Sequence, residues 1–189
     1  MLYNVLNHGF FPEKSKKSVT FIKVLRYITG VVKYRSFYNR YKKMLFAYLM
    51  RITGDYYLSS DIMQESFTRY LDRYGKHKQS APLLFKIARN ALLDYQRKSK
   101  RSTQLLDENE FSGGNSEHHL LVRDEYRRVL SAMQQLGKIE RDVLALVVSC
   151  DMSYREIADI TNTSEQNVKV RVHRARKKLR EIIEKGSER

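Results

Sequence analysis

Proline and glycine are scarce in this chain, which has two prolines and eight glycines among 189 residues. Because both residues interrupt helices, long helices are possible along most of the sequence. Apolar side chains also recur at the three- and four-residue spacing of an amphipathic helix, most clearly over residues 84–95. The sequence therefore predicts an all-α fold.

Charge divides the chain into segments. The formal net charge is +15, yet residues 102–122 contain four acidic residues and no Lys or Arg. This acidic stretch includes Ser-Gly-Gly-Asn-Ser and is typical of a flexible linker. We therefore predict two small helical domains, over residues 35–101 and 123–189, joined by this linker. A basic extension over residues 1–34, with six Lys or Arg and one Glu, precedes them.

The first domain is predicted to contain three helices. The first covers residues 36–53, the second starts after the possible N-cap pair Ser59-Ser60 and stops at Gly75, and the third begins near Ser80. A weaker helical signal covers residues 19–32.

The second domain is predicted to contain four helices. Two of them, over residues 122–136 and 140–148, are separated by Gly137. Ser153 and Glu156 then form a capping-box pattern that starts a short helix. A polar turn follows, and a basic helix covers residues 165–184. Two helices joined by a short polar turn, the second of them basic, indicate a helix-turn-helix that binds DNA.

The last helix has two different sides. Its apolar residues Val168, Val172, Ala175 and Leu179 share one side, whereas residues 165–180 hold seven Lys or Arg and one acidic residue. Such a helix suits the DNA major groove. The side chains predicted to contact bases are Lys169, Val170, His173 and Arg174, with Gln166 and Asn167 as possible additions. Those predicted to contact phosphates are Arg171, Arg176 and Lys178.

Residues 136–179 resemble region 4, the promoter-binding region of sigma factors. The resemblance rests on Ser-Tyr-Arg-Glu-Ile-Ala at 153–158 and His-Arg-Ala-Arg at 173–176. Upstream, residues 61–67 are similar to the polymerase-binding helix of region 2, and residues 84–90 are similar to its −10 helix. Since no third folded region fits between them, the chain resembles the extracytoplasmic-function (ECF) group of sigma factors.

This resemblance implies specific roles for residues of the first domain. The residues implied in binding the largest subunit of RNA polymerase are Asp61, Gln64, Glu65 and Phe67, although Phe67 also suits a core position. The loop residues implied in holding a flipped base of the −10 element are Lys76, His77, Lys78, Gln79 and Ser80. Those implied in following the DNA backbone are Lys86, Arg89, Asn90, Arg97, Lys98 and Arg101.

The implied partners are core RNA polymerase, promoter DNA and an anti-sigma factor. We expect no small-molecule substrate, cofactor or metal, because the histidines lack metal-ligand spacing and the chain has no phosphate-binding glycine loop or nucleophile elbow. The chain is therefore not expected to be an enzyme. A cytoplasmic location is expected, since Cys150 is the only cysteine and no secretion signal is evident.

Two alternatives stay open. An ordinary DNA-binding regulator with an unrelated helical N-terminal domain would have a similar last domain, and polymerase dependence would separate it from a sigma factor. The basic extension over residues 1–34 lies outside the family pattern and is compatible with an anchor to anionic membranes. Leu83 also departs from the pattern, because the family usually has Trp there.

Overall fold

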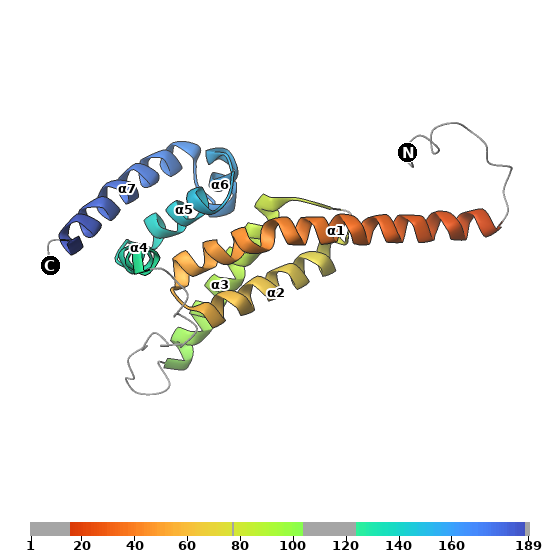
Figure 1. Cartoon of the computed structure of the whole chain (residues 1–189), viewed down its shortest axis with the longest axis horizontal. Helices are drawn as coiled ribbons and strands as arrows, with labels where there is room; N and C mark the ends of the chain where they lie inside the picture. The colour runs from red at the N-terminus through yellow and green to blue at the C-terminus, as the bar shows by residue number, and fades with distance from the viewer. Residues whose placement is uncertain (1–15, 77, 104–123, 188–189) are drawn as a thin grey trace.

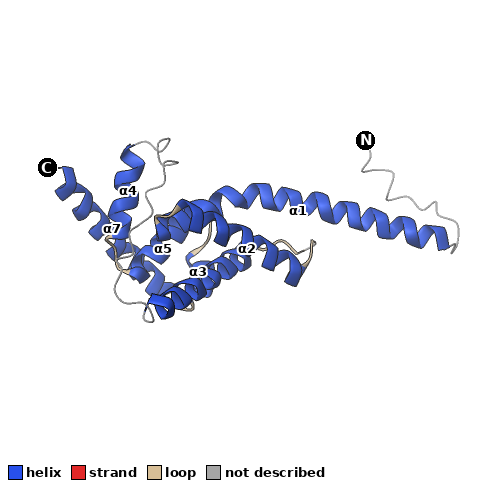
Figure 2. Ribbon diagram, turned by 90° about the horizontal axis from the view of Figure 1, so that it is seen from below, coloured by secondary structure: helices blue, strands red, loops and turns tan. Residues whose placement is uncertain are grey.

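The computed structural model describes residues 16–76, 78–103 and 124–187, and its described part consists of seven α-helices and no strand (Figures 1 and 2). The helices are α1 (Lys16–Thr53), α2 (Tyr56–Tyr74), α3 (Ala81–Thr103), α4 (Asp124–Gln134), α5 (Lys138–Ser149), α6 (Tyr154–Thr161) and α7 (Glu165–Ser187). The all-α prediction is confirmed, with three helices before the acidic segment and four after it. Most of the predicted linker lies outside the described residues.

The first helix is much longer than predicted. The expected helix over residues 36–53 is the second half of α1, which spans 38 residues and absorbs the weak signal over 19–32. Its sequence contains no proline and one glycine, so nothing in it ends the helix. The helix stops at Gly54, whose positive φ of 70° suits glycine and whose N–H donates to the Met50 carbonyl.

The start of α2 also differs from the prediction. Its N-cap is Asp55, whose carboxylate accepts the Leu58 N–H at 3.0 Å, and not the Ser59-Ser60 pair. Ser59 lies inside the helix and is fully buried, with its hydroxyl 2.8 Å from that of Thr53. The helix ends before Gly75, as predicted.

The boundary at Gly137 is confirmed, since α4 ends before it and α5 begins directly after it. Four consecutive residues of α5, over 143–146, are buried. Helix α5 is therefore central to the second half of the molecule, where it contacts α6 and α7.

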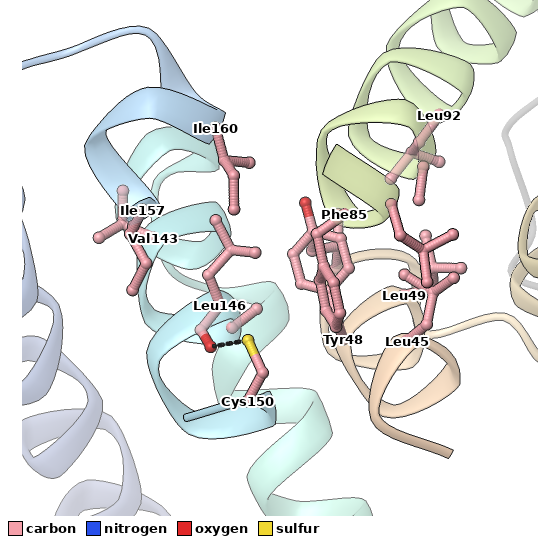
Figure 3. Packing of buried hydrophobic residues seen from close by; sticks show 14 of the residues in the cluster. Leu45, Tyr48, Leu49, Phe85, Leu92, Val143, Leu146, Cys150, Ile157 and Ile160 are labelled. Carbon is pink, nitrogen blue, oxygen red and sulfur yellow. Dashed lines mark hydrogen bonds between the residues drawn. The ribbon is translucent and has the colours of Figure 1, made fainter. Parts of the chain in front are cut away.

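The two halves share one hydrophobic core, which the sequence did not predict. Helix α1 packs on α2 from its own half and on α5 from the other half, while α3 packs on α6. Figure 3 shows Tyr48 and Phe85 of the first half facing Leu146 and Ile160 of the second. Tyr48 is fully buried, and its ring centroid lies 5.5 Å from that of Phe85. Burial of this apolar surface holds the halves together.

Cys150 is a core residue at the end of α5. It is 9% exposed, and its thiol donates to the Leu146 carbonyl at 3.2 Å (Figure 3). Burial, helped by the nearby Glu156 and Asp151 carboxylates, raises the pKa of the thiol to about 12. The thiol is therefore a poor nucleophile at neutral pH. Within the described part of the chain, no helix is long and apolar enough to cross a membrane.

Candidate nucleic-acid interface

Helices α6 and α7 form a helix-turn-helix whose turn is fixed by caps. The Ser153 hydroxyl accepts the Glu156 N–H at 3.2 Å, and the Glu156 carboxylate accepts the Ser153 N–H at 2.8 Å, so the predicted capping box is present. Asn162 ends α6 in the left-handed conformation, with φ of 55°. Ser164 then starts α7 by accepting the Asn167 N–H at 3.2 Å. These local bonds set the angle at which α7 leaves α6.

Helix α7 presents its polar side to solvent. Three residues of the predicted apolar seam, Val168, Val172 and Ala175, are at most 2% exposed, and the fourth, Leu179, is half-buried. The six side chains predicted to contact bases, and two of the three predicted to contact phosphates, are exposed: Gln166, Asn167, Lys169, Val170, His173, Arg174, Arg176 and Lys178. Lys169 forms a 2.9 Å ion pair with Glu165, but both side chains are about half exposed, so the pair contributes little to the stability of the fold.

Arg171 is the exception on α7. It is half-buried and lines a pocket between the two halves, together with Arg89, Asp142 and Asn162. The phosphate contact predicted for Arg171 is therefore less accessible in this arrangement than those predicted for Arg176 and Lys178.

The loop before α3 is held by a residue that the sequence did not single out. The Tyr70 hydroxyl donates to the Lys78 carbonyl at 3.1 Å and accepts the Ser80 N–H at 2.8 Å. The Lys78 ammonium lies 4.8 Å from the centre of the Tyr74 ring, and Gln79 donates to the Lys33 carbonyl at 2.9 Å. The loop backbone is thus fixed from outside the loop. His77 lies outside the described residues.

The exposed side of α3 is partly occupied by the second half of the molecule. Lys86 donates to the Asp159 carbonyl of α6 at 3.0 Å, and Arg89 forms a 2.6 Å ion pair with Asp142 of α5. Asn90 and Arg97 stay exposed, and Arg97 pairs weakly with Asp94 at 3.3 Å. Two of the six residues expected to follow the DNA backbone, Lys86 and Arg89, therefore make contacts within the protein.

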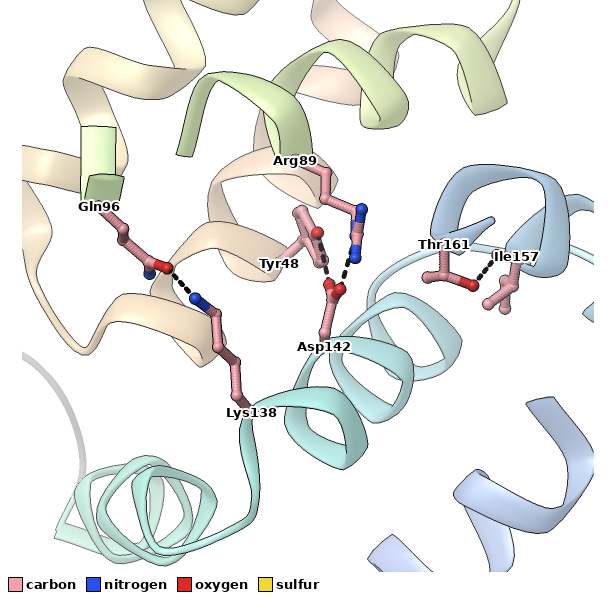
Figure 4. A network of polar contacts seen from close by, with 7 residues as sticks. All are labelled: Tyr48, Arg89, Gln96, Lys138, Asp142, Ile157 and Thr161. Atoms are coloured by element: carbon pink, nitrogen blue, oxygen red, sulfur yellow. Dashed lines mark hydrogen bonds and ion pairs between the residues drawn. The ribbon is translucent and has the colours of Figure 1, made fainter. Parts of the chain in front are cut away.

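Asp142 is the centre of this contact (Figure 4). One carboxylate oxygen accepts the Tyr48 hydroxyl at 2.9 Å, and the other accepts Arg89 Nε at 2.6 Å. Burial, reinforced by the Asp142 charge, raises the pKa of Tyr48 well above its ordinary value, so its hydroxyl remains a donor. Figure 4 also shows Lys138 of α5 donating to Gln96 of α3 nearby.

Arg141 forms a second junction between the halves. Its guanidinium donates to the Ile52 carbonyl at 3.1 Å and to the Gln134 and Leu136 carbonyls at 2.7 and 3.0 Å. Its Nε is buried without a hydrogen-bond partner within the described residues, and burial lowers the pKa of the group. The end of α1, the α4–α5 turn and α5 are therefore held by one side chain.

The predicted polymerase-binding set divides into two parts. Asp61, Gln64 and Glu65 lie exposed on α2, and Glu65 pairs with Arg69 at 2.6 Å. Phe67 is instead 3% exposed, so the prediction that it contacts the polymerase is corrected. The centroid of its ring lies 4.6 Å from that of Tyr38, because this position of α2 faces α1 and not solvent.

Comparison with known proteins agrees with this arrangement. The sigma-70 region 2 family model matches residues 37–102, and the sigma-70 region 4 model matches residues 126–179. The two matches fall on the two helical halves, in the order expected from the sequence. The fold and its exposed basic helix thus define a sigma-70 type transcription factor.

Relatives narrow this class. The ECF RNA polymerase sigma factor SigM of Bacillus subtilis is 32% identical over 156 residues, which cover 79% of this chain and 94% of SigM. SigW of the same organism is 26% identical over 158 residues, covering 76% and 84% of the two chains. The chain belongs to the extracytoplasmic-function group of the sigma-70 family.

A solved structure supports the fold. The sigma factor RpoE from Bartonella quintana, in complex with the anti-sigma factor NepR, superposes with a TM-score of 0.65 at 18% identity. The match covers 79% of this chain and 96% of RpoE. Sigma factors work with core RNA polymerase at promoter DNA, so the two main partners expected from the sequence are those of the family.

Proposed function

We propose that this chain directs core RNA polymerase to promoters by placing α7 in the major groove of the −35 element and by using α3 with loop 76–80 to open the −10 element. The observation that carries the proposal is the cross-section of α7. Its buried seam fixes the helix to α5 and α6, and its other side offers exposed amide, imidazole and guanidinium groups. These groups match the hydrogen-bonding pattern of base edges and phosphates.

The −10 function requires the two halves to separate. In the arrangement described above, Arg89 is held in a part-buried ion pair with Asp142 of α5, and the exposed Lys86 donates to α6. DNA and the second half would compete for the same side of α3. We therefore expect that binding of polymerase or DNA displaces α5 and α6 from α3.

The polymerase contact is proposed on α2. Asp61, Gln64 and Glu65 form an exposed acidic and polar surface on the side of α2 that is turned away from the core. Such a surface suits a basic helical partner. An anti-sigma factor is also proposed as a partner, because the structurally similar RpoE was solved with one.

In vitro transcription tests the proposal. Core polymerase supplied with this chain and a promoter library should initiate from a subset of promoters that share −35 and −10 sequences, and it should not initiate there without the chain. Failure of the chain to associate with core polymerase, combined with strong binding to duplex DNA alone, would instead indicate an ordinary DNA-binding regulator.

A further inference from the structure

The N-terminal part of α1 projects from the body of the molecule. Figures 1 and 2 both show it extending well beyond the end of α2. Among the described side chains of α1, Tyr34 and Phe37 are the first to join the core, and the Tyr34 hydroxyl donates to the Phe67 carbonyl at 3.3 Å. Ile28, Val31 and Val32, which precede Tyr34 on α1, therefore lie outside the hydrophobic core.

This projection carries exposed aliphatic side chains. Ile28, Val31 and Val32 are 52%, 38% and 62% exposed. In the sequence, six apolar residues share one side of the helical register, at positions 21, 24, 25, 28, 31 and 32, whereas Val19 and Ile22 fall on the other side. Lysines and an arginine occupy the opposite side, at positions 16, 23, 26 and 33, while Lys17 and Arg35 bound the apolar side at its two ends. We call residues 16–35 the projecting helix.

The charge of α1 is entirely of one sign. Its 38 residues include ten Lys or Arg and no Asp or Glu. Two copies of such a helix would repel one another, which disfavours self-association through the apolar side. A DNA backbone would attract the basic side but would leave the aliphatic side chains in water. An anionic membrane has charged headgroups that attract the basic side of the helix and an apolar interior that removes its aliphatic side chains from water.

We propose that the projecting helix binds an anionic lipid membrane, lying along the headgroup layer with its aliphatic side inserted and its lysines among the lipid phosphates. This inference goes beyond the proposed promoter function. In Figure 1 the projecting helix and α7 lie at opposite ends of the molecule. Membrane binding at one end is therefore compatible with an exposed α7 at the other.

Vesicle co-sedimentation of the full chain tests this. Vesicles of phosphatidylcholine alone are compared with vesicles of phosphatidylcholine and phosphatidylglycerol in equal parts. The Ile28→Gln/Val32→Gln variant should partition to the mixed vesicles at least roughly tenfold less than wild type, because two aliphatic side chains no longer leave water. The matched control is Val148→Gln, which changes an aliphatic residue of α5 that is 50% exposed, and it should partition like wild type.

The charge contribution is tested by Lys23→Gln/Lys33→Gln, which should lower partition by roughly fivefold for each lysine at low salt. Helicity by circular dichroism and association with core polymerase should be unchanged in all variants. The proposal is overturned by equal partition of the Ile28→Gln/Val32→Gln variant and its control, or by equal binding to neutral and mixed vesicles. It is also overturned if this variant abolishes self-association in sedimentation velocity or weakens binding to duplex DNA.

Discussion

Helices α3 and α7 are both amphipathic and basic, but they differ in how accessible they are. The polar side of α7 is open to solvent along nearly its whole length. The corresponding side of α3 is contacted by α5 and α6, through Arg89–Asp142 and Lys86–Asp159. The comparison teaches that a sequence pattern identifies an amphipathic basic helix, whereas tertiary packing decides how much of its polar side is accessible.

Helix α6 contacts both the accessible helix α7 and the partly covered helix α3. Helix α6 packs on α7 within the helix-turn-helix and on α3 across the two halves. The element that orients α7, the proposed −35 helix, therefore also covers part of α3, the proposed −10 helix. We accordingly expect −10 binding, and not −35 binding, to depend on opening of the molecule.

The largest effect is expected from Asp142→Ala. This change leaves the Tyr48 hydroxyl and the Arg89 guanidinium without their shared acceptor, at a cost of about 3 kcal/mol in the free energy of unfolding by urea. Because it weakens the contact over α3, it should also increase binding of the free chain to a single-stranded −10 oligonucleotide while leaving binding to a −35 duplex unchanged.

The matched control is Asp94→Ala, which removes the exposed 3.3 Å pair with Arg97. Exposed pairs contribute little, so stability should change by less than about 0.5 kcal/mol. The proposed difference between α3 and α7 fails if Asp142→Ala strengthens binding to both DNA elements equally or to neither.

The next largest effect is expected from Arg174→Ala. If Arg174 contacts a base, its loss should weaken discrimination at one −35 position by about 2 kcal/mol, measured by in vitro transcription over a promoter library. Opening of the −10 element should be unaffected. Arg176→Ala is the comparison variant: as a phosphate contact, it should weaken all promoters alike and reduce the salt dependence by about one ion. Identical profiles for the two variants would remove Arg174 from the base-contacting set.

A smaller effect is expected from Ser153→Ala, which removes the cap of α6. The free energy of unfolding should fall by about 1 kcal/mol, because the Glu156 N–H loses its acceptor. Ser36→Ala, at an exposed site within α1, should change stability very little. Since α6 packs on both α3 and α7, Ser153→Ala should weaken the proposed −35 binding and loosen the cover of α3 together. If Ser153→Ala changed only −35 binding or only the cover of α3, α6 would not couple these two properties.

The smallest effect at neutral pH is expected from Cys150, which lies at the junction between the halves. Burial raises the pKa of its thiol from an ordinary value of 9.0 to about 12. The thiol therefore favours folding fully below pH 9, and this contribution is lost as the pH rises toward 12, by at most about 1.4 kcal/mol per pH unit. Stability should fall more steeply above pH 9 in wild type than in Cys150→Ala, as urea unfolding would measure. Parallel curves would show that the thiol is not buried.

Local signals were predictable from the sequence, and contacts across the chain were not. The capping box at Ser153 and Glu156 and the seam on α7 depend on residues three or four positions apart, which a single helix reveals. The Tyr48–Asp142 and Arg89–Asp142 bonds join residues 94 and 53 positions apart, and no periodicity indicates them. The cap at Asp55 was missed because Ser59-Ser60 offered an equally good capping residue type nearby.

The Tyr70 hydroxyl bonds both the Lys78 carbonyl and the Ser80 N–H, so the path of the loop before α3 is set by a residue of α2. Because both bonds are made to main-chain atoms, they do not depend on which side chains stand at positions 78 and 80. Under the −10 role proposed for this loop, substitutions there would change promoter preference while Tyr70 keeps the main chain in place. A tyrosine outside the loop thereby separates the path of the loop main chain from the identity of these side chains.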